Sequence, residues 1–140
     1  MTILDTNVVS ELIAASPSEL VVHWISTQRL RDDLLVTAVT VAEILYGVDL
    51  LPKGKRRDRL HHQAQAMFAE DFAGRVLPFD EQAARVFAPL TAIRRAQGRP
   101  IAEFDAQIAA IARVHDATLA TRNTADFEDC GVRLVNPWQE

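Results

Sequence analysis

The stretch MTILDTNVVSEL, residues 1–12, decides the fold class. Thr2, Ile3 and Leu4 form a short β-prone run without polar alternation, and Asp5 follows directly, before a helix-like pattern begins. Short runs of this kind are typical of parallel strands that are buried on both faces. Ligands of parallel α/β sheets bind at the carboxyl ends of the strands, so Asp5 is a candidate functional residue.

The rest of the chain repeats this alternation of strands and helices. Further strands are expected at residues 34–38, 74–79, 119–121 and 132–138, and helices at residues 8–15, 56–72 and 102–114. This alternation predicts an α/β fold with a parallel sheet between layers of helices. Capping patterns predict three more helix starts: Ser16 with Pro17 and Glu19, Thr40 with Glu43, and Asp80.

The composition is that of a globular domain without disulfides. The 140 residues suit a single domain, residues 1–140, and 49% of them are hydrophobic. The single cysteine, Cys130, excludes an internal disulfide. No apolar run approaches the roughly 20 residues of a membrane helix, and the first residues do not resemble a signal peptide. These features predict a cytoplasmic protein that does not enter a membrane.

The formal net charge of −4 argues against a protein that simply coats nucleic acid. An enzyme with an acidic metal site and local basic residues is compatible with it. Of the 15 basic residues, 13 are Arg, which suits the binding of phosphates and carboxylates. A GC-rich genome would give the same bias.

Four carboxylates occupy comparable positions at one edge of the expected sheet. Asp5 ends the first strand, and Glu43 lies in the first turn after the second. Asp105 lies early in the helix of residues 102–114, and Asp126 follows the fourth strand. Each alone also has a structural interpretation, as a helix cap, half of a capping box, a favourable charge at a helix start or a turn residue.

Together, the four acids favour a cation site. Asp105 shares a helix face with Ile108 on the side that packs inward, and a carboxylate at a buried edge is costly unless it is paired or binds a cation. Ligands that are all oxygens favour Mg²⁺ or Mn²⁺. No Cys/His spacing indicates zinc, and the histidines are expected to face solvent or partners: His23, His61, His62 and His115.

A carboxylate site for Mg²⁺ predicts chemistry on phosphate esters. Mg²⁺ keeps several waters and binds substrate phosphates. A metal-bound water is more acidic and can attack a phosphodiester, and the metal stabilises the charge that develops. The residues themselves therefore predict metal-dependent phosphoryl-group chemistry.

Five segments resemble the PIN-domain ribonucleases, specifically the VapC toxins of bacterial toxin–antitoxin pairs and their FitB-like subgroup. The segments are LDTNVVSEL, TAVTVAEILYGV, FDAQIAAIA, ATRNTADF and NPW, and the match runs from Thr2 to Trp138. The resemblance implies a three-layer α/β/α PIN-like domain with a central parallel sheet of four to five short strands. It also implies a toxin that is an endoribonuclease dependent on Mg²⁺ or Mn²⁺, with one or two ions per site.

Carried onto this chain, the resemblance implies a site of four acids. Asp5, Glu43 and Asp105 correspond to the three core metal ligands. The fourth acid stands in some members where this chain has Asn123, and in others at Asp126. We favour Asp126, with Asn123 as a neutral hydrogen-bonding or water-bridging neighbour.

The implied reaction is hydrolysis of RNA by a water that the metal positions and acidifies. One of the acids serves as general base, and the products carry 5′-phosphate and 3′-hydroxyl ends. Thr6 and Asn7 are expected to hydrogen-bond the Asp5 loop or a metal-bound water. The RNA that is cleaved stays open among transfer, ribosomal and messenger RNA.

The resemblance also implies partners. They are a cognate VapB-like antitoxin and a second copy of the chain, as a homodimer or a dimer of toxin–antitoxin heterodimers. In the family, the antitoxin wraps the toxin and an antitoxin Arg often reaches the acidic pocket. The antitoxin also binds operator DNA, so contact with DNA is expected only through it.

Two basic stretches, KGKRR and RRAQGR, are candidates for contacts with RNA phosphates. Solvated helix ends are an equal alternative. Trp24 and Trp138 are expected to pack in the core or an interface. The candidate basic residues are Lys53, Lys55, Arg56, Arg57, Arg94, Arg95 and Arg99.

Three other functions receive less support. A haloacid-dehalogenase-like phosphatase needs a second Asp two residues after the first, where this chain has Asn7. A non-catalytic PIN-like regulatory or binding module, acting with a DNA-binding partner, would be favoured by loss of a core acid. A flap-type DNA nuclease carries more acids and DNA-binding insertions.

Overall fold

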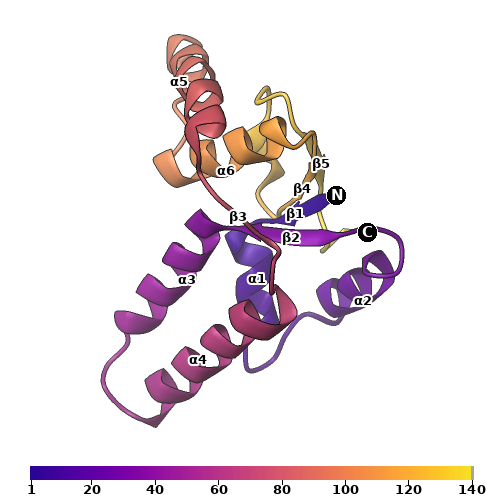
Figure 1. Ribbon diagram of the computed structural model, residues 1–140, viewed down its shortest axis with the longest axis vertical. Coiled ribbons are helices and arrows are strands. Elements are labelled where there is room, and N and C mark those ends of the chain that lie inside the picture. The colour runs from indigo at the N-terminus through magenta and orange to yellow at the C-terminus, as the bar shows by residue number, and fades with distance from the viewer. Residues whose placement is uncertain (140) are drawn as a thin grey trace.

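Five short parallel strands form the centre of the fold (Figure 1). The computed structural model describes residues 1–139, and Glu140, the last residue of the predicted domain, lies outside this part. The strands run in the spatial order β3-β2-β1-β4-β5, and every neighbouring pair is parallel. They are β1 (Thr2–Leu4), β2 (Leu34–Thr37), β3 (Val76–Leu77), β4 (Thr118–Ala120) and β5 (Arg133–Val135).

The strand order reverses at β1. The chain proceeds from β1 outward to β2 and β3, and then returns to form β4 and β5 on the other side of β1. The carboxyl ends of β1 and β4 therefore flank the switch point of the sheet, which is where open α/β sheets bind their ligands.

Helices cover the sheet on both sides, which confirms the predicted α/β fold. In Figure 1, helices α1 to α4 gather on one side of the sheet, and α5 and α6 lie on the other. The first group is α1 (Thr6–Leu12), α2 (Glu19–Gln28), α3 (Ala38–Asp49) and α4 (Lys55–Ala66), which continues into the π-helical turn η1 (Met67–Asp71). The second group is α5 (Glu81–Ala96) and α6 (Glu103–Val114).

Successive strand residues pack into two separate cores. Ile3 of β1 joins the core under α5 and α6, whereas Leu4 joins the core under α1 to α4. Leu119 and Ala120 of β4 divide in the same way. Both faces of the central strands are buried, which explains why these strands lack polar alternation. The three-layer α/β/α arrangement is thus confirmed.

The first two helices begin at residues other than those predicted. Asp5 caps α1, because its carboxylate accepts from the backbone amide of Thr6, so the helix starts two residues earlier than expected. α2 starts after Ser18 rather than Ser16. The Ser18 amide instead donates to Glu11 Oε1 at 2.7 Å. The start of α2 is therefore bound by Glu11 of α1, a contact that the local capping pattern of Ser16, Pro17 and Glu19 does not predict.

The third helix also differs from the prediction, with a consequence for the site. Thr37 caps α3, since its hydroxyl accepts from the Thr40 amide at 3.1 Å, and the Thr40–Glu43 capping box does not form. Thr37 retains the extended backbone of β2, so the helix starts as soon as the strand ends. Glu43 then lies beyond the first turn and is free for contacts outside its own helix.

The remaining elements agree with the predictions to within two residues at each end, except that β5 ends three residues earlier than predicted. Asp80 caps α5 as expected, with its carboxylate accepting from the Ala83 amide at 3.0 Å. Trp24 is buried in the core under α1 to α4, and Trp138 is partly buried and packs against the same core. Within residues 1–139, no helix combines the length and the apolar character needed to cross a bilayer.

Candidate active site

Asp5 lies at the centre of the candidate site, where β1 ends and α1 begins. Its backbone amide donates to the Ala120 carbonyl at 2.9 Å, and its side chain is only 4% exposed. Three groups donate to its carboxylate: Thr121 Oγ1 at 2.7 Å, the Thr6 amide at 2.8 Å and Asn7 Nδ2 at 3.2 Å. The carboxylate is therefore held in one orientation at the ends of β1 and β4.

Thr6 joins Asp5 to the second acid. Its hydroxyl donates to Glu43 Oε1 at 2.8 Å and lies 2.9 Å from the hydroxyl of Thr40. Because the single hydroxyl proton of Thr6 is directed to Glu43, the Thr40 hydroxyl donates to Thr6. One residue thus contacts two candidate acids, Asp5 through its amide and Glu43 through its side chain.

The other two acids come from the opposite end of the chain. Asp105 lies in the first turn of α6 and is partly buried. Asp126 is exposed and lies in a short 3-10 helix, η2 (Thr124–Phe127), whose Asp126 amide donates to the Asn123 carbonyl at 3.0 Å. The charge of Asp126 raises the pKa of Asp5, and the charge of Asp5 raises the pKa of Asp105.

The pKa of Asp105 shows how strongly the four acids interact. Burial, followed by the charges of Asp5, Asp126 and Glu43, raises the pKa of Asp105 to about 6. Each of these charges disfavours ionisation of a neighbouring carboxyl group. The structure therefore brings the four predicted acids into one electrostatic group.

Burial also raises the pKa of Asp5 and the pKa of Glu43. For Asp5, the hydrogen bonds from Thr121 and Thr6 offset part of this effect, and the charge of Asp126 adds to it. For Glu43, the Thr6 hydroxyl lowers the pKa and the charge of Asp5 raises it. The net shift is upward in both cases, so full ionisation of the cluster is unfavourable without a compensating positive charge.

This donor set fits a hard divalent cation, which prefers oxygen ligands and removes the repulsion between carboxylates. Within residues 1–139, no three His, Cys, Asp or Glu side chains are already arranged around one point as metal ligands. Metal binding would therefore require rotation of at least one acid. Asp126 is exposed and Glu43 is half-buried, so both have room to rotate.

Thr121 is a residue of the site that was not predicted. Besides donating to Asp5, its hydroxyl accepts from the Asn123 amide at 3.1 Å and from Asn7 Nδ2 at 3.3 Å. The strand register pairs Leu4 with Ala120, so the residues that follow the two strands lie side by side. The position of Thr121 directly after a buried strand is the one sequence feature that marks it as a candidate site residue. The sequence does not show the register of β1 and β4 that brings it to Asp5.

An unpredicted cation flanks the same edge. Arg122 is exposed, and its guanidinium lies 5.0 Å from the ring centre of Trp138. Its backbone amide donates to Asn7 Oδ1 at 3.3 Å, and its carbonyl accepts from Asn136 Nδ2 at 3.4 Å. Asn136 and Trp138 of the NPW segment therefore contact Arg122, which lies between β4 and η2.

The first predicted basic stretch lies at the surface. Lys53, Lys55 and Arg56 are exposed around the start of α4, and Arg57 is half-buried. Arg56 also lines a groove of about 440 Å³ between α1, α3 and α4, which extends to Thr6 and Glu43. This stretch is therefore free to contact a ligand beside the acids.

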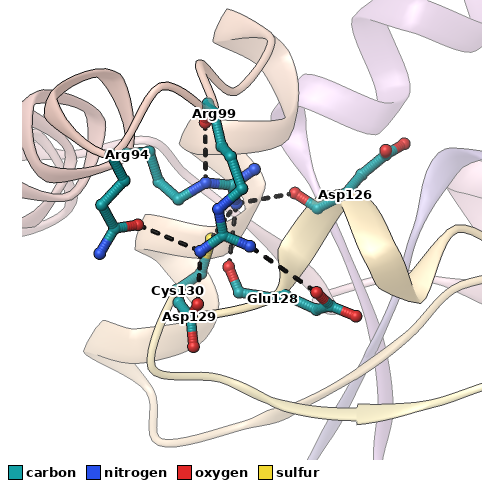
Figure 2. Close-up of polar contacts among 7 residues, drawn as sticks. Arg94, Arg99, Asp126, Glu128, Asp129 and Cys130 are labelled. Carbon is teal, nitrogen blue, oxygen red and sulfur yellow. Dashed lines mark hydrogen bonds and ion pairs between the residues drawn. The ribbon is translucent and has the colours of Figure 1, made fainter.

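The second basic stretch requires a correction. Arg94 is 5% exposed, and its guanidinium donates to backbone carbonyls and to the Cys130 thiol (Figure 2). The prediction that Arg94 contacts RNA is wrong, because α5 directs this side chain inward. Arg95 is exposed, whereas Arg99 forms ion pairs with Glu128 and Asp129.

Comparison with known proteins identifies related sequences over the whole chain. The model of the PIN domain family matches residues 2–131. Toxin FitB of Neisseria gonorrhoeae is 41% identical over 140 residues, all of both chains. VapC ribonuclease Y4jK of Sinorhizobium fredii is 42% identical over 99% of both chains. The solved structure of FitAB bound to a DNA fragment superposes with a TM-score of 0.90, at 42% identity, over 99% of this chain and 96% of the other.

Proposed function

Because the chain belongs to the PIN-domain family, and to its VapC- and FitB-like group, we propose that it is an endoribonuclease and the toxin of a toxin–antitoxin pair. The observation that supports the proposal best is the link through Thr6 between Asp5 and Glu43, together with the charges of Asp5, Asp126 and Glu43 that raise the pKa of Asp105. The relatives are named as a toxin and a ribonuclease, and a metal bound by these acids would supply the chemistry of a ribonuclease.

We assign Asp5, Glu43, Asp105 and Asp126 as the residues that would hold one or two Mg²⁺ or Mn²⁺ ions. When bound, the metal supplies a more acidic water and neutralises charge on the phosphodiester. Without a cation, an ionised cluster would repel an RNA phosphate by the same electrostatics that raise the pKa of Asp105. The proposed ribonuclease is therefore metal-dependent.

The residues of the chain have distinct tasks in this proposal. Asp5 provides a fixed point, since three donors restrain its carboxylate. Thr6 sets the position of Glu43 relative to Asp5. Asp105 and Asp126 complete the site from α6 and η2, and one of the four acids accepts the proton of the attacking water. The expected products carry 5′-phosphate and 3′-hydroxyl ends.

The proposed inhibitor is a VapB-like antitoxin. Solved structures similar to this chain are those of FitAB bound to a DNA fragment and of FitAcB from Neisseria gonorrhoeae, which supports a protein partner. The groove of about 440 Å³ is lined mainly by apolar residues and ends at Thr6 and Glu43, so it suits a peptide segment that presents a cation to the acids. Contact with DNA is proposed only through this partner. A cytoplasmic location, where RNA and the antitoxin are both present, is part of the same proposal.

The proposed assembly is a homodimer, or a dimer of toxin–antitoxin heterodimers. Large apolar side chains stay exposed on the single chain, which supports burial against a second copy. Sedimentation of the purified chain, alone and with its antitoxin, tests this assembly. The exposed side chains include Tyr46, Leu50, Ile93 and Phe104.

Incubation of the purified chain with total cellular RNA tests the proposed function. Discrete cleavage is expected with Mg²⁺ or Mn²⁺, and none with EDTA or in the Asp5→Asn variant. Asp33→Asn is a matched control, because Asp33 is exposed and precedes β2, at the opposite edge of the sheet. Absence of cleavage by the folded, antitoxin-free chain would instead favour a non-catalytic module that acts with a DNA-binding partner.

A further inference from the structure

Arg94 lies in the last turn of α5 and has almost no contact with solvent. Its Nε donates to the Arg99 carbonyl at 2.9 Å, and its Nη1 donates to the carbonyls of Asp126 and Glu128, both at 3.0 Å. The Cys130 thiol is a further acceptor at 3.3 Å. Figure 2 shows the dashed lines that join the Arg94 guanidinium to Arg99, Asp126 and Glu128.

These contacts join two segments that are far apart in the sequence. The Arg99 carbonyl belongs to the connection between α5 and α6, which leads to Asp105. The carbonyls of Asp126 and Glu128 belong to the end of η2 and the residue after it. One side chain therefore binds both the segment that precedes one proposed acid and the segment that carries another.

The surroundings of Arg94 indicate that it fixes the position of one segment relative to another. Its acceptors are backbone carbonyls and a thiol, which compensate a buried positive charge less well than a carboxylate does. The carbonyls at the end of a short helix otherwise lack partners, and a planar guanidinium can bind several of them at once. At the surface, Arg99 reinforces the same connection through ion pairs with Glu128 and Asp129.

We propose that Arg94 is a positioning residue for the active site: its buried guanidinium fixes η2 against the connection between α5 and α6, and so holds Asp126 at the edge of the sheet that carries the other proposed acids. The catalytic consequence rests on the proposed function, whereas the placement of η2 does not. Arg94 itself contacts neither RNA nor metal.

The Arg94→Met variant tests this role, because Met has a similar length and no donors. Arg94→Lys keeps the charge with fewer directed bonds, and Arg85→Met is the matched control at an exposed position of the same helix. The two measurements are amide hydrogen exchange of each folded protein and calorimetric titration with Mn²⁺. Neither measurement requires RNA cleavage.

In Arg94→Met, the amides of Asp126, Glu128 and Cys130 should exchange about tenfold faster or more, while those of β1 stay unchanged. Affinity for Mn²⁺ should fall about 10- to 100-fold. Arg94→Lys should lie between the native chain and Arg94→Met, and Arg85→Met should match the native chain. In an Asp126→Asn background, adding Arg94→Met should change the affinity by less than about threefold, because both changes affect the same contact.

Native exchange around η2 in the Arg94→Met protein would overturn the proposal. An equal loss of Mn²⁺ affinity in both backgrounds would also overturn it, because the effect would then not act through Asp126. Failure of both Arg94 variants to fold would make Arg94 a general structural residue instead. If the native chain binds no Mn²⁺, the proposed metal site is wrong, and the exchange pattern alone decides the role of Arg94.

Discussion

The hydroxyl of Thr121 donates a 2.7 Å hydrogen bond to the carboxylate of Asp5 and so joins the ends of β4 and β1. The same oxygen accepts from the Asn123 amide at 3.1 Å, at the start of the segment that leads to Asp126. The uncharged Thr121 side chain therefore orients Asp5 and also binds the segment that leads to Asp126. The site depends on this second layer of contacts as well as on its carboxylates.

Replacing Thr121 by Val should destabilise the protein by about 1–3 kcal/mol, because the buried Asp5 carboxylate and the Asn123 amide each lose a partner. Urea unfolding near neutral pH measures the change. Thr91→Val is a suitable control, since the Thr91 hydroxyl donates to a carbonyl of its own helix, that of Phe87, and not to a residue of the site. A Thr121→Val protein as stable as the native chain would show that the bond does not hold Asp5.

Thr6→Val should reduce RNA cleavage about tenfold, since Glu43 loses the hydroxyl that positions it. Thr6→Ser should restore most of the rate, because Ser keeps the donor. Single-turnover rates with saturating enzyme measure both effects without a contribution from product release. A native rate in Thr6→Val would show that the hydroxyl does not position Glu43 for cleavage, and a loss confined to Thr6→Ser would indicate that packing of the Thr6 methyl group matters instead.

Asp105→Asn should make the metal-free protein more stable at about pH 7.5, by about 1 kcal/mol after allowance for the solvent exposure of this carboxyl group. The folded-state pKa of about 6 lies above the usual Asp pKa of 3.8, so the native chain loses stability as the pH rises through this interval. The Asn variant does not ionise and avoids that loss.

The advantage of the Asn variant should therefore shrink as the pH falls from about 6 toward about 4, because the Asp105 carboxyl becomes protonated in the folded chain before it does so in the unfolded chain. Urea unfolding in EDTA, at several pH values between these limits, gives the comparison. A stability difference that does not change with pH would contradict the raised pKa.

Changing Lys53, Lys55 and Arg56 together to Gln should raise KM for RNA and leave kcat within about twofold, if these exposed residues bind phosphates. The slope of log KM against log salt should fall by about 2, as expected for the loss of three phosphate contacts on single-stranded RNA. An unchanged salt slope would favour solvated helix ends. A matched control replaces three exposed arginines elsewhere: Arg31, Arg75 and Arg85.

Much of the fold could be predicted from local pattern. The short apolar runs mark strands that are buried on both faces, and the carboxyl ends of parallel strands share one edge, so Asp5 and Glu43 could be placed near each other. Helix starts were less predictable, because Thr37 and Thr40 are both suitable caps. The strand geometry, which the sequence does not show, decides in favour of Thr37.

The supporting residues of the site could not be predicted, because they depend on tertiary relationships. Thr121 meets Asp5 only through the register of β1 and β4. Arg94 stands in a basic stretch that resembles a solvated helix end, and its burial follows from the side of α5 that faces residues 126–130. Spacing along one helix does not show which loop will cover it.

Single-turnover cleavage of one labelled RNA, with each of the four acids replaced in turn, tests the proposed site as a whole. With Mg²⁺ present, Asp5→Asn, Glu43→Gln, Asp105→Asn and Asp126→Asn should each be slower than the native chain by about 100-fold or more, and the Asp33→Asn control should be unchanged. A folded variant of any of the four that cleaves at the native rate would remove that acid from the site. Native rates in all four variants would contradict the proposed ribonuclease mechanism.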